Sequence, residues 1–236
     1  MKKAVFLHIF YSHLYEEILQ ALKKTNFDFN LYVNLVEGHS DMLKESLLKE
    51  FQEAVVLISP NQGMDCGGQL RILNYWLKQG KNEELLVFIH SKGKPVDYPD
   101  KVKVEEVDTL RELLMSIIRP DKSSLIEPAF QDESVGMVGV KEWYLRPPIP
   151  HGYPIPECKY YCDMLNLKNY ENNSFGFIGG TMFWVRASIY KKVFESLDII
   201  KLVGELPPYS NGGNIHALER IFGYIVLNEG YKITGV

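Results

Sequence analysis

Residues 4–10 read AVFLHIF, a run that is apolar at every position except His8. A short continuous apolar run of this kind is typical of a strand buried on both faces, as in a parallel sheet. The segment 12–24 follows with leucine and isoleucine at helical spacing, and Ser12 is a candidate N-cap. This strand and helix set the pattern for the first half of the chain.

The same alternation continues outward from this pair. Strands are expected at 29–35, 53–59 and 85–90, and helices are expected between them at 40–52 and 68–79. Alternating strands and helices at this spacing predict right-handed βαβ units and a parallel sheet.

The second half alternates less regularly and contains long stretches rich in Gly, Pro or aromatic residues. Loops longer than about 15 residues are usually functional or mobile. We expect helices at 108–118, 187–196 and 215–228, a helix or loop from 125, strands at 135–140, 175–186 and 231–233, and loops at 93–107, 141–174 and 205–214.

Length, composition and charge exclude several classes of protein. With 236 residues, 46% hydrophobic and 24% charged, the chain suits one large α/β domain. A net charge of -4 without a basic stripe argues against nucleic acid. No apolar stretch approaches the ~20 residues that span a bilayer. Three cysteines and no signal peptide predict a reducing, cytoplasmic compartment.

The loop 60–68, PNQGMDCGG, joins a predicted strand to a predicted helix. Ligands of α/β sheets bind at the carboxyl ends of strands, and a helix N-terminus favours anionic groups. Gly63 and Gly67 would let a ligand approach the backbone, and Asn61 and Asp65 can hydrogen-bond a ribose or sugar hydroxyl. The alternative is a tight loop whose Asp65 caps the helix. The pattern is neither Gly-x-Gly-x-x-Gly nor a Walker loop.

His90, Ser91 and Lys92 end the fourth predicted strand. Two potential cations and a hydroxyl could meet a diphosphate there, whereas no carboxylate is offered to Mg²⁺ or Mn²⁺. The alternative is an ordinary strand end with a solvated lysine.

Two later segments could complete a site. Gly179 and Gly180 precede Thr181 and Trp184, so that a sugar could approach the backbone and stack on the indole. Alternatively, Trp184 alternates into a core. Glu219 on the last helix could act as a general base once desolvated, or it could form a solvated pair with Arg220.

These pieces occur in the same order in a known family, and the chain resembles the rhamnan synthesis protein F family of bacterial polysaccharide glycosyltransferases. The resemblance implies a GT-A-like (Rossmann-like) α/β fold with a mainly parallel central sheet flanked by helices. It also implies a single domain spanning 1–236. The matching pieces are LHIFYSHLYEEI, NQGMDCGG, IHSKGKP, SVGMVGV, GGTMFWVRASIY and ALERIFGYI.

The order is also similar to that of the broader GT-A inverting transferases, with two departures. His90-Ser91-Lys92 stands where those enzymes carry Asp-x-Asp, so a need for Mg²⁺ or Mn²⁺ stays open. Arg220 replaces the Asp of their late Glu-Asp pair, beside Glu219. Members of the rhamnan family are expected to carry His-Thr-Lys at the strand end.

The resemblance implies transfer of rhamnose or another deoxyhexose from a dTDP- or UDP-linked donor to a glycan or lipid-linked glycan. It leaves room for peripheral association with the inner face of the membrane. The half at about 1–120 would bind nucleotide, and the half at about 121–236 would bind acceptor and hold the base. The implied residues are His8, Asn61, Gly63, Asp65 and Gly67 for the donor, His90, Lys92 and Glu219 for catalysis, and Trp143, Gly180, Thr181 and Trp184 for sugar and acceptor.

Two rival classes remain. A non-catalytic glycan- or nucleotide-sugar-binding domain would explain the missing Asp-x-Asp. A sugar-nucleotide-modifying enzyme would need a Gly-x-x-Gly fingerprint or a glycine-rich basic loop after the first strand, where residues 11–14 read YSHL.

Overall fold

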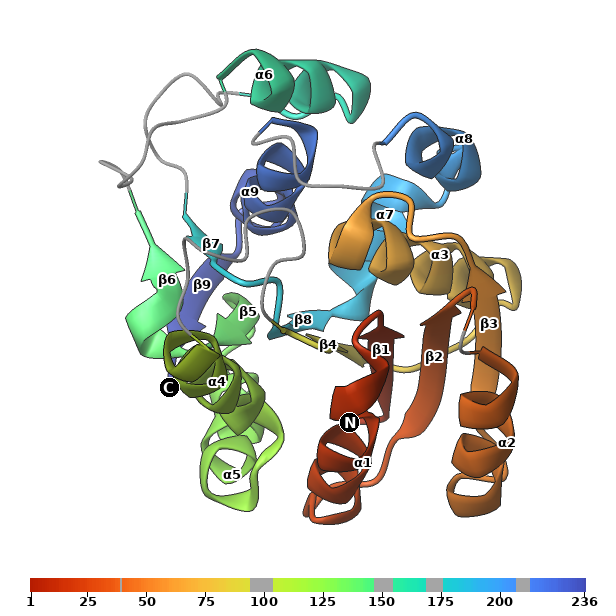
Figure 1. Ribbon diagram of the computed structural model, residues 1–236. Helices are drawn as coiled ribbons and strands as arrows, with labels where there is room; N and C mark the ends of the chain where they lie inside the picture. The colour runs from red at the N-terminus through yellow and green to blue at the C-terminus, as the bar shows by residue number, and fades with distance from the viewer. Residues whose placement is uncertain (39, 94–103, 147–154, 169–175, 207–212) are drawn as a thin grey trace.

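A computed structural model describes residues 1–38, 40–93, 104–146, 155–168, 176–206 and 213–236 (Figure 1). The first half forms β1 (Lys3–Ile9), α1 (Tyr15–Lys23), β2 (Asn30–Val36), α2 (Ser40–Glu50), β3 (Val55–Ser59), α3 (Met64–Lys78) and β4 (Leu85–His90). The second half forms α4 (Val104–Met115), α5 (Pro120–Ala129), β5 (Val135–Gly139), β6 (Tyr144–Leu145), α6 (Ile155–Met164), β7 (Phe177–Ile178), β8 (Phe183–Arg186), α7 (Ala187–Phe194), α8 (Ile199–Gly204), α9 (Asn214–Asn228) and β9 (Lys232–Gly235).

The central sheet has seven strands in the order β3-β2-β1-β4-β8-β5-β9. Among the described strands of this sheet, only β8 runs against its neighbours, β4 and β5. The chain travels from β1 outward to β3 and returns to β4 on the other side of β1. The carboxyl ends of β1 and β4 therefore form the switch point where α/β sheets bind ligands.

Strand alternation divides the core into two layers, one on each face of the sheet (Figure 1). Ala4 and Phe6 face the layer of α3, α7 and α9, whereas Val5 and Leu7 face the layer of α1 and α5. Successive side chains of a strand point to opposite faces, which is why both layers draw on every central strand. The architecture confirms the predicted α/β fold with a mainly parallel sheet flanked by helices.

Alternation also explains a polar row at the carboxyl edge of the sheet. His8 of β1 lies in register with Asn34 of β2 and with His90 of β4, so the three side chains share one face. That face carries α3, because the Cβ that an alanine would add at Gly68 would meet the His8 ring. Three polar residues at the ends of apolar strands are thus brought together beneath one helix.

Three predicted segments are wrong. The strand expected at 175–186 is broken into β7 and β8, because Gly180 and Thr181 adopt left-handed φ angles of 82° and 51°. The loop expected at 141–174 contains β6 and α6, although residues 147–154 and 169–175 lie outside the described part. The helix expected from 68 begins at Met64.

The remaining differences are smaller. Helix α5 begins at Pro120 and overlaps only the start of the segment from 125 that was expected to be a helix or loop, and α8 was not predicted. Of the loops expected at 93–107 and 205–214, residues 94–103 and 207–212 lie outside the described part, and 104–107 begin α4.

A buried carboxylate ties β2, α3 and β4 together at the amino end of the sheet. Glu83 is 4% exposed and accepts hydrogen bonds from Asn30 Nδ2 at 2.7 Å, Tyr32 Oη at 2.8 Å and Trp76 Nε1 at 2.8 Å. Burial by itself would raise the pKa of Glu83, but these hydrogen bonds hold it below its ordinary value.

We predict that Glu83→Ala lowers the free energy of unfolding by about 3 kcal/mol, because three buried hydrogen-bond donors lose their acceptor. Because the folded pKa is lowered, the ionised Glu83 stabilises the fold above its unfolded pKa, and this contribution is lost as pH falls through the folded pKa. Urea unfolding between pH 7 and 3 measures both effects. The control is Glu84→Ala, at the exposed neighbour, which should change stability by less than about 0.5 kcal/mol. Equal losses in the two variants would contradict the assignment.

Candidate functional site

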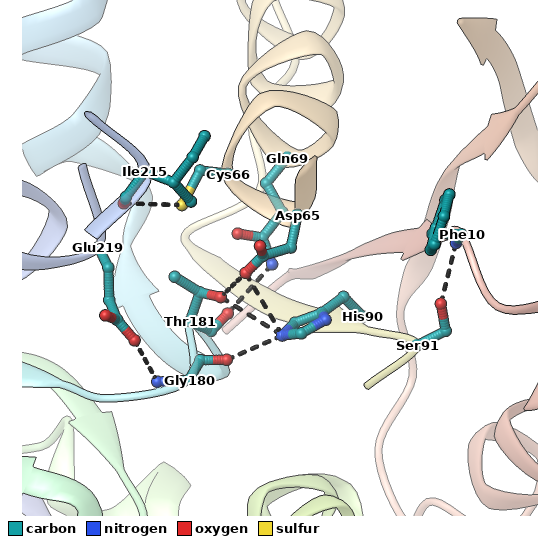
Figure 2. Close-up of polar contacts among 10 residues, drawn as sticks. All are labelled: Phe10, Asp65, Cys66, Gln69, His90, Ser91, Gly180, Thr181, Ile215 and Glu219. Carbon is teal, nitrogen blue, oxygen red and sulfur yellow. Dashed lines mark hydrogen bonds and ion pairs between the residues drawn. The ribbon is translucent and has the colours of Figure 1, made fainter. Parts of the chain in front are cut away.

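Four separate segments bring polar groups together at the carboxyl ends of β1 and β4 (Figure 2). The backbone of Gly180 lies at the centre: its N–H donates to Glu219 Oε1 at 2.6 Å, and its carbonyl lies 2.9 Å from His90 Nε2. His90 Nε2 is also 3.5 Å from Asp65 Oδ2, and Thr181 Oγ1 donates to that same oxygen. One turn of chain therefore links α3, β4 and α9.

This turn is strained. Thr181 is β-branched and adopts a φ of 51°, which is rare for such residues because Cβ crowds the backbone. A strained residue of this kind costs about 1–3 kcal/mol and persists only where its surroundings hold it. Besides Asp65, Gln69 Nε2 donates to the Thr181 carbonyl at 3.0 Å. Strain held by several side chains is a feature of functional sites.

The pKa values of the two carboxylates of the site are shifted in opposite directions. Burial raises the pKa of Asp65, but His90, Lys92 and the Thr181 hydroxyl together lower it below its ordinary value. Burial also raises the pKa of Glu219, and here the Gly180 N–H and Lys92 only partly offset it. Asp65 is therefore the carboxylate that stays ionised, while Glu219 takes up a proton more readily.

His90 is placed to orient the turn. The side chain is 5% exposed, and burial lowers its pKa despite the attraction of Asp65. A neutral ring whose Nε2 faces the Gly180 carbonyl carries its proton on Nε2, an assignment made from the hydrogen-bond network. With His90 neutral, the positive charges that act on the two carboxylates come from Lys92 and Arg220.

The donor set offers little to a metal ion. Within the described ranges, no three His, Cys, Asp or Glu side chains are grouped so that they could hold one. Asp65 is surrounded by Thr181, His90 and Lys92, and His90 uses its Nε2 on a carbonyl. One carboxylate beside a lysine does not match the oxygen-rich coordination of Mg²⁺ or Mn²⁺.

A model of the rhamnan synthesis protein F family matches residues 1–231. The chain belongs to this family. It is thereby connected with polysaccharide synthesis. No curated protein gives a significant match.

Among solved structures, the family member is similar to a cytidylyltransferase from Leptospira borgpetersenii serovar Hardjo-bovis (strain JB197). That likeness has 12% identity and a TM-score of 0.42, and covers 100% of this chain and 75% of the other. It is also similar to a 4-diphosphocytidyl-2C-methyl-D-erythritol synthase, with 11% identity, a TM-score of 0.44 and coverage of 89% and 88%. Among the residues that the structure describes, no helix of this chain is long and apolar enough to cross a membrane.

The structure brings together Asp65, His90, Gly180, Thr181 and Glu219 of the residues predicted for this family member, and Lys92 is close enough to act on both carboxylates. Asp65 does not cap α3. It lies within the first turn of that helix, and its side chain reaches Thr181. Asn61 is half-buried before α3, and its role stays a prediction.

His8 lies beneath α3 rather than in an open cleft. It is 2% exposed, and its Nδ1 accepts a hydrogen bond from Asn34 Nδ2 at 3.1 Å, while Asn34 Oδ1 accepts one from Ser59 Oγ at 3.0 Å. Burial lowers its pKa to about 4, so the ring is neutral near pH 7. The expected direct contact of His8 with a nucleotide is replaced by support of the helix that carries Asp65.

The two glycines of the 60–68 loop serve the packing of the loop. Gly63 has a φ of 77°, and an added Cβ would meet Leu206 Cδ1 at 2.6 Å. A Cβ on Gly67 would lie 2.0 Å from the Gln62 carbonyl oxygen. Gly67 therefore lets the loop fold back on the first turn of α3, which is a structural reason for a residue that was expected to bind the donor.

The expectation that Trp184 stacks on a sugar is wrong. Its side chain is fully buried on the face of α1 and α5, where its ring packs edge-on against Phe27 and its Nε1 donates to the Ile117 carbonyl at 3.1 Å. The site lies on the opposite face, as strand alternation requires. Trp143 lies beside the turn, since its carbonyl accepts from the Gly179 N–H at 2.8 Å.

Sequence reasoning missed Gln69 and Arg111, which shape the site, and it considered the Ser91 hydroxyl only as a partner for a diphosphate. Gln69 follows Asp65 by one helical turn, so its spacing could have indicated it. Ser91 Oγ accepts from the backbone N–H groups of Phe10 and Tyr11, both at 2.9 Å, and joins the end of β1 to the end of β4. Arg111 donates to the Lys92 carbonyl at 3.1 Å and to Glu17 at 2.8 Å, contacts that no local pattern foretells.

We predict that Gly67→Ala lowers the free energy of unfolding by about 1–3 kcal/mol, because the new methyl group meets backbone that cannot move aside. Gly204→Ala is the matched control. This helical glycine has no atom within 4 Å of an added Cβ, so alanine should be neutral or stabilise by up to about 1 kcal/mol. Thermal and urea unfolding of both variants measure the difference. A Gly67→Ala protein as stable as Gly204→Ala would contradict the packing role.

Proposed function

We propose that this protein is a glycosyltransferase that uses a nucleoside-diphosphate sugar and inverts the anomeric centre. One observation carries the proposal: Asp65 of α3, His90 of β4 and Glu219 of α9 meet at one strained turn at the switch point of the sheet. Membership of a polysaccharide synthesis family supports the choice of sugar transfer over other reactions at such an edge.

Glu219 is the proposed general base. Its carboxylate is oriented by the Gly180 N–H at 2.6 Å and lies 3.6 Å from Arg220 Nη1. A carboxylate with a raised pKa is a stronger base than a solvated one. The acceptor hydroxyl loses its proton to Glu219 while its oxygen bonds to the anomeric carbon. The bond from that carbon to the diphosphate breaks, and the diphosphate keeps the electron pair.

Lys92 is proposed to stabilise the charge that develops on the leaving diphosphate. The ammonium lowers the pKa of both Asp65 and Glu219, so its positive charge acts on both carboxylates of the cluster. A fixed cation near a leaving group is worth several kcal/mol in a water-excluded site. Asp65 holds Thr181 and His90 in place through its carboxylate.

The finer assignments of the proposal come from the resemblance to the rhamnan synthesis family. The donor is a dTDP- or UDP-linked sugar, with rhamnose or another deoxyhexose as the group transferred. The acceptor is a glycan or a lipid-linked glycan at the cytoplasmic face of a membrane. In this proposal the charge of Lys92 takes the part that Mg²⁺ or Mn²⁺ plays in transferases with Asp-x-Asp.

We predict that Glu219→Gln reduces transfer by about 10²–10⁴-fold, because the amide cannot accept the acceptor's proton. Glutamine keeps an oxygen for the Gly180 N–H, so the turn and the thermal stability should be retained. In the wild-type protein, kcat/KM should fall as pH drops through the raised pKa of Glu219, since the base must be ionised. Transfer is measured by release of the nucleoside diphosphate. Wild-type activity in Glu219→Gln would remove this residue from the role.

We also predict that dTDP or UDP raises the melting temperature and that EDTA leaves the shift unchanged. A ligand at about 100 times its Kd stabilises the folded state by about 2.7 kcal/mol. Lys92→Ala should shrink the shift, whereas Lys78→Ala, at the exposed far end of α3, should not. Loss of the shift in EDTA would contradict the metal-free mechanism. Nucleotide binding without transfer or donor hydrolysis would favour a non-catalytic domain.

A further inference from the structure

An open cavity lies near the start of α9. It has a volume of about 370 Å³ and is lined by residues of α6, α8 and α9 and by Glu205 after α8, and these helices gather on one side of the sheet (Figure 1). Pockets of about 300–1,000 Å³ are of the size that holds small ligands. Its lining residues are Pro156, Glu157, Tyr160, Tyr161, Leu202, Glu205 and Asn214.

The side chains of this cavity combine aromatic rings with hydrogen-bond acceptors. Tyr160 is 50% exposed, and its ring meets that of Tyr161 edge-on at 5.2 Å. The Tyr161 hydroxyl donates to Asn214 Oδ1 at 3.2 Å, and Glu205 lies 3.5 Å from the Tyr160 hydroxyl. Rings with polar tips present an apolar face and a hydrogen-bonding edge to the same ligand.

The charge of the lining decides between ligand classes. The described lining residues include two glutamates and no Lys, Arg or His. A phosphate or nucleoside diphosphate would be repelled there, because like charges at short range oppose binding. A neutral ligand with many hydroxyl groups and apolar ring faces fits both the carboxylates and the tyrosines. A saccharide has this chemistry.

The cavity and Glu219 share helix α9. Asn214 begins α9, and Glu219 follows five residues later, about 7.5 Å along the helix axis. Cys66, the residue after Asp65, lies with its Sγ 3.8 Å from the Ile215 carbonyl oxygen (Figure 2). Gln62 also donates to the Gly204 carbonyl at 2.6 Å, which ties the loop before α3 to α8. The helices that form the cavity are thus fixed directly to the catalytic segments.

We infer that this cavity binds the acceptor saccharide, with Tyr160 as the exposed ring and Glu157 as an acceptor for sugar hydroxyls. The inference rests on the proposed transferase function, but binding can be measured without transfer. The two ends of the site then differ in charge: Lys92 faces the diphosphate, and the glutamates face the neutral acceptor.

In the test, rhamnan oligosaccharides of two to six sugars are titrated into the full chain. Binding is measured by calorimetry and by saturation-transfer NMR. Tyr160→Ala and Glu157→Gln should each weaken binding on the order of tenfold, equivalent to about 1.4 kcal/mol. Tyr160→Phe should bind nearly as the wild type does, since it keeps the ring. Leu125→Ala on α5, with a wild-type exposure of 56%, is the matched surface control and should bind normally.

Each result bears on one claim. Oligosaccharide binding that is absent in the wild type, or unchanged in both Tyr160→Ala and Glu157→Gln, would overturn the acceptor site. Glu219→Gln should bind the oligosaccharide normally while losing transfer. Saccharide binding by a wild-type protein that transfers no sugar would leave the acceptor site standing and reject the proposed function instead.

Discussion

The site depends on the hydrogen bonds made by the backbone N–H and carbonyl of Gly180. Its N–H fixes Glu219 and its carbonyl fixes His90, while the next residue, Thr181, binds Asp65 and Gln69. A left-handed threonine is unfavourable alone, so the turn exists only because helices α3 and α9 and strand β4 meet around it. The same contacts make the turn a rigid reference point. A shift of about 1 Å in any one of these elements would misplace the others.

The site contains two carboxylates, Asp65 and Glu219, whose surroundings favour different protonation states. Asp65 has a cationic neighbour and a hydroxyl donor, and it stays ionised, whereas the burial of Glu219 favours its neutral form. This division lets one group hold the structure while the other exchanges a proton. Lys92 serves both, since its charge lowers the pKa of each. Arg111 of α4 donates a hydrogen bond to the Lys92 carbonyl. The strand end that carries Lys92 is therefore held by a helix of the opposite layer.

The fold was more predictable from the sequence than the site was. Continuous apolar runs with alternating helices predicted β1 to β4, and His8 and His90 stood out because they interrupt such runs. The turn at Gly180 could not be predicted, because its φ angles are imposed by distant partners such as Glu219. Trp184 was misassigned because an aromatic strand residue suits a core and a sugar site equally. Helix α6 was hidden in a segment rich in proline and aromatic residues.

The end of β4 shows how a strand end without Asp-x-Asp can still organise a site. The Ser91 hydroxyl accepts two backbone N–H groups from the segment after β1, a task that needs only one hydroxyl oxygen. Threonine carries the same oxygen, so the His-Thr-Lys expected of relatives and the His90-Ser91-Lys92 found here are interchangeable in this contact. His90 contacts the turn, and the charge of Lys92 lowers the pKa of both carboxylates. The three residues of this strand end therefore have three separate roles: Ser91 joins two strand ends, His90 contacts the turn, and Lys92 supplies positive charge.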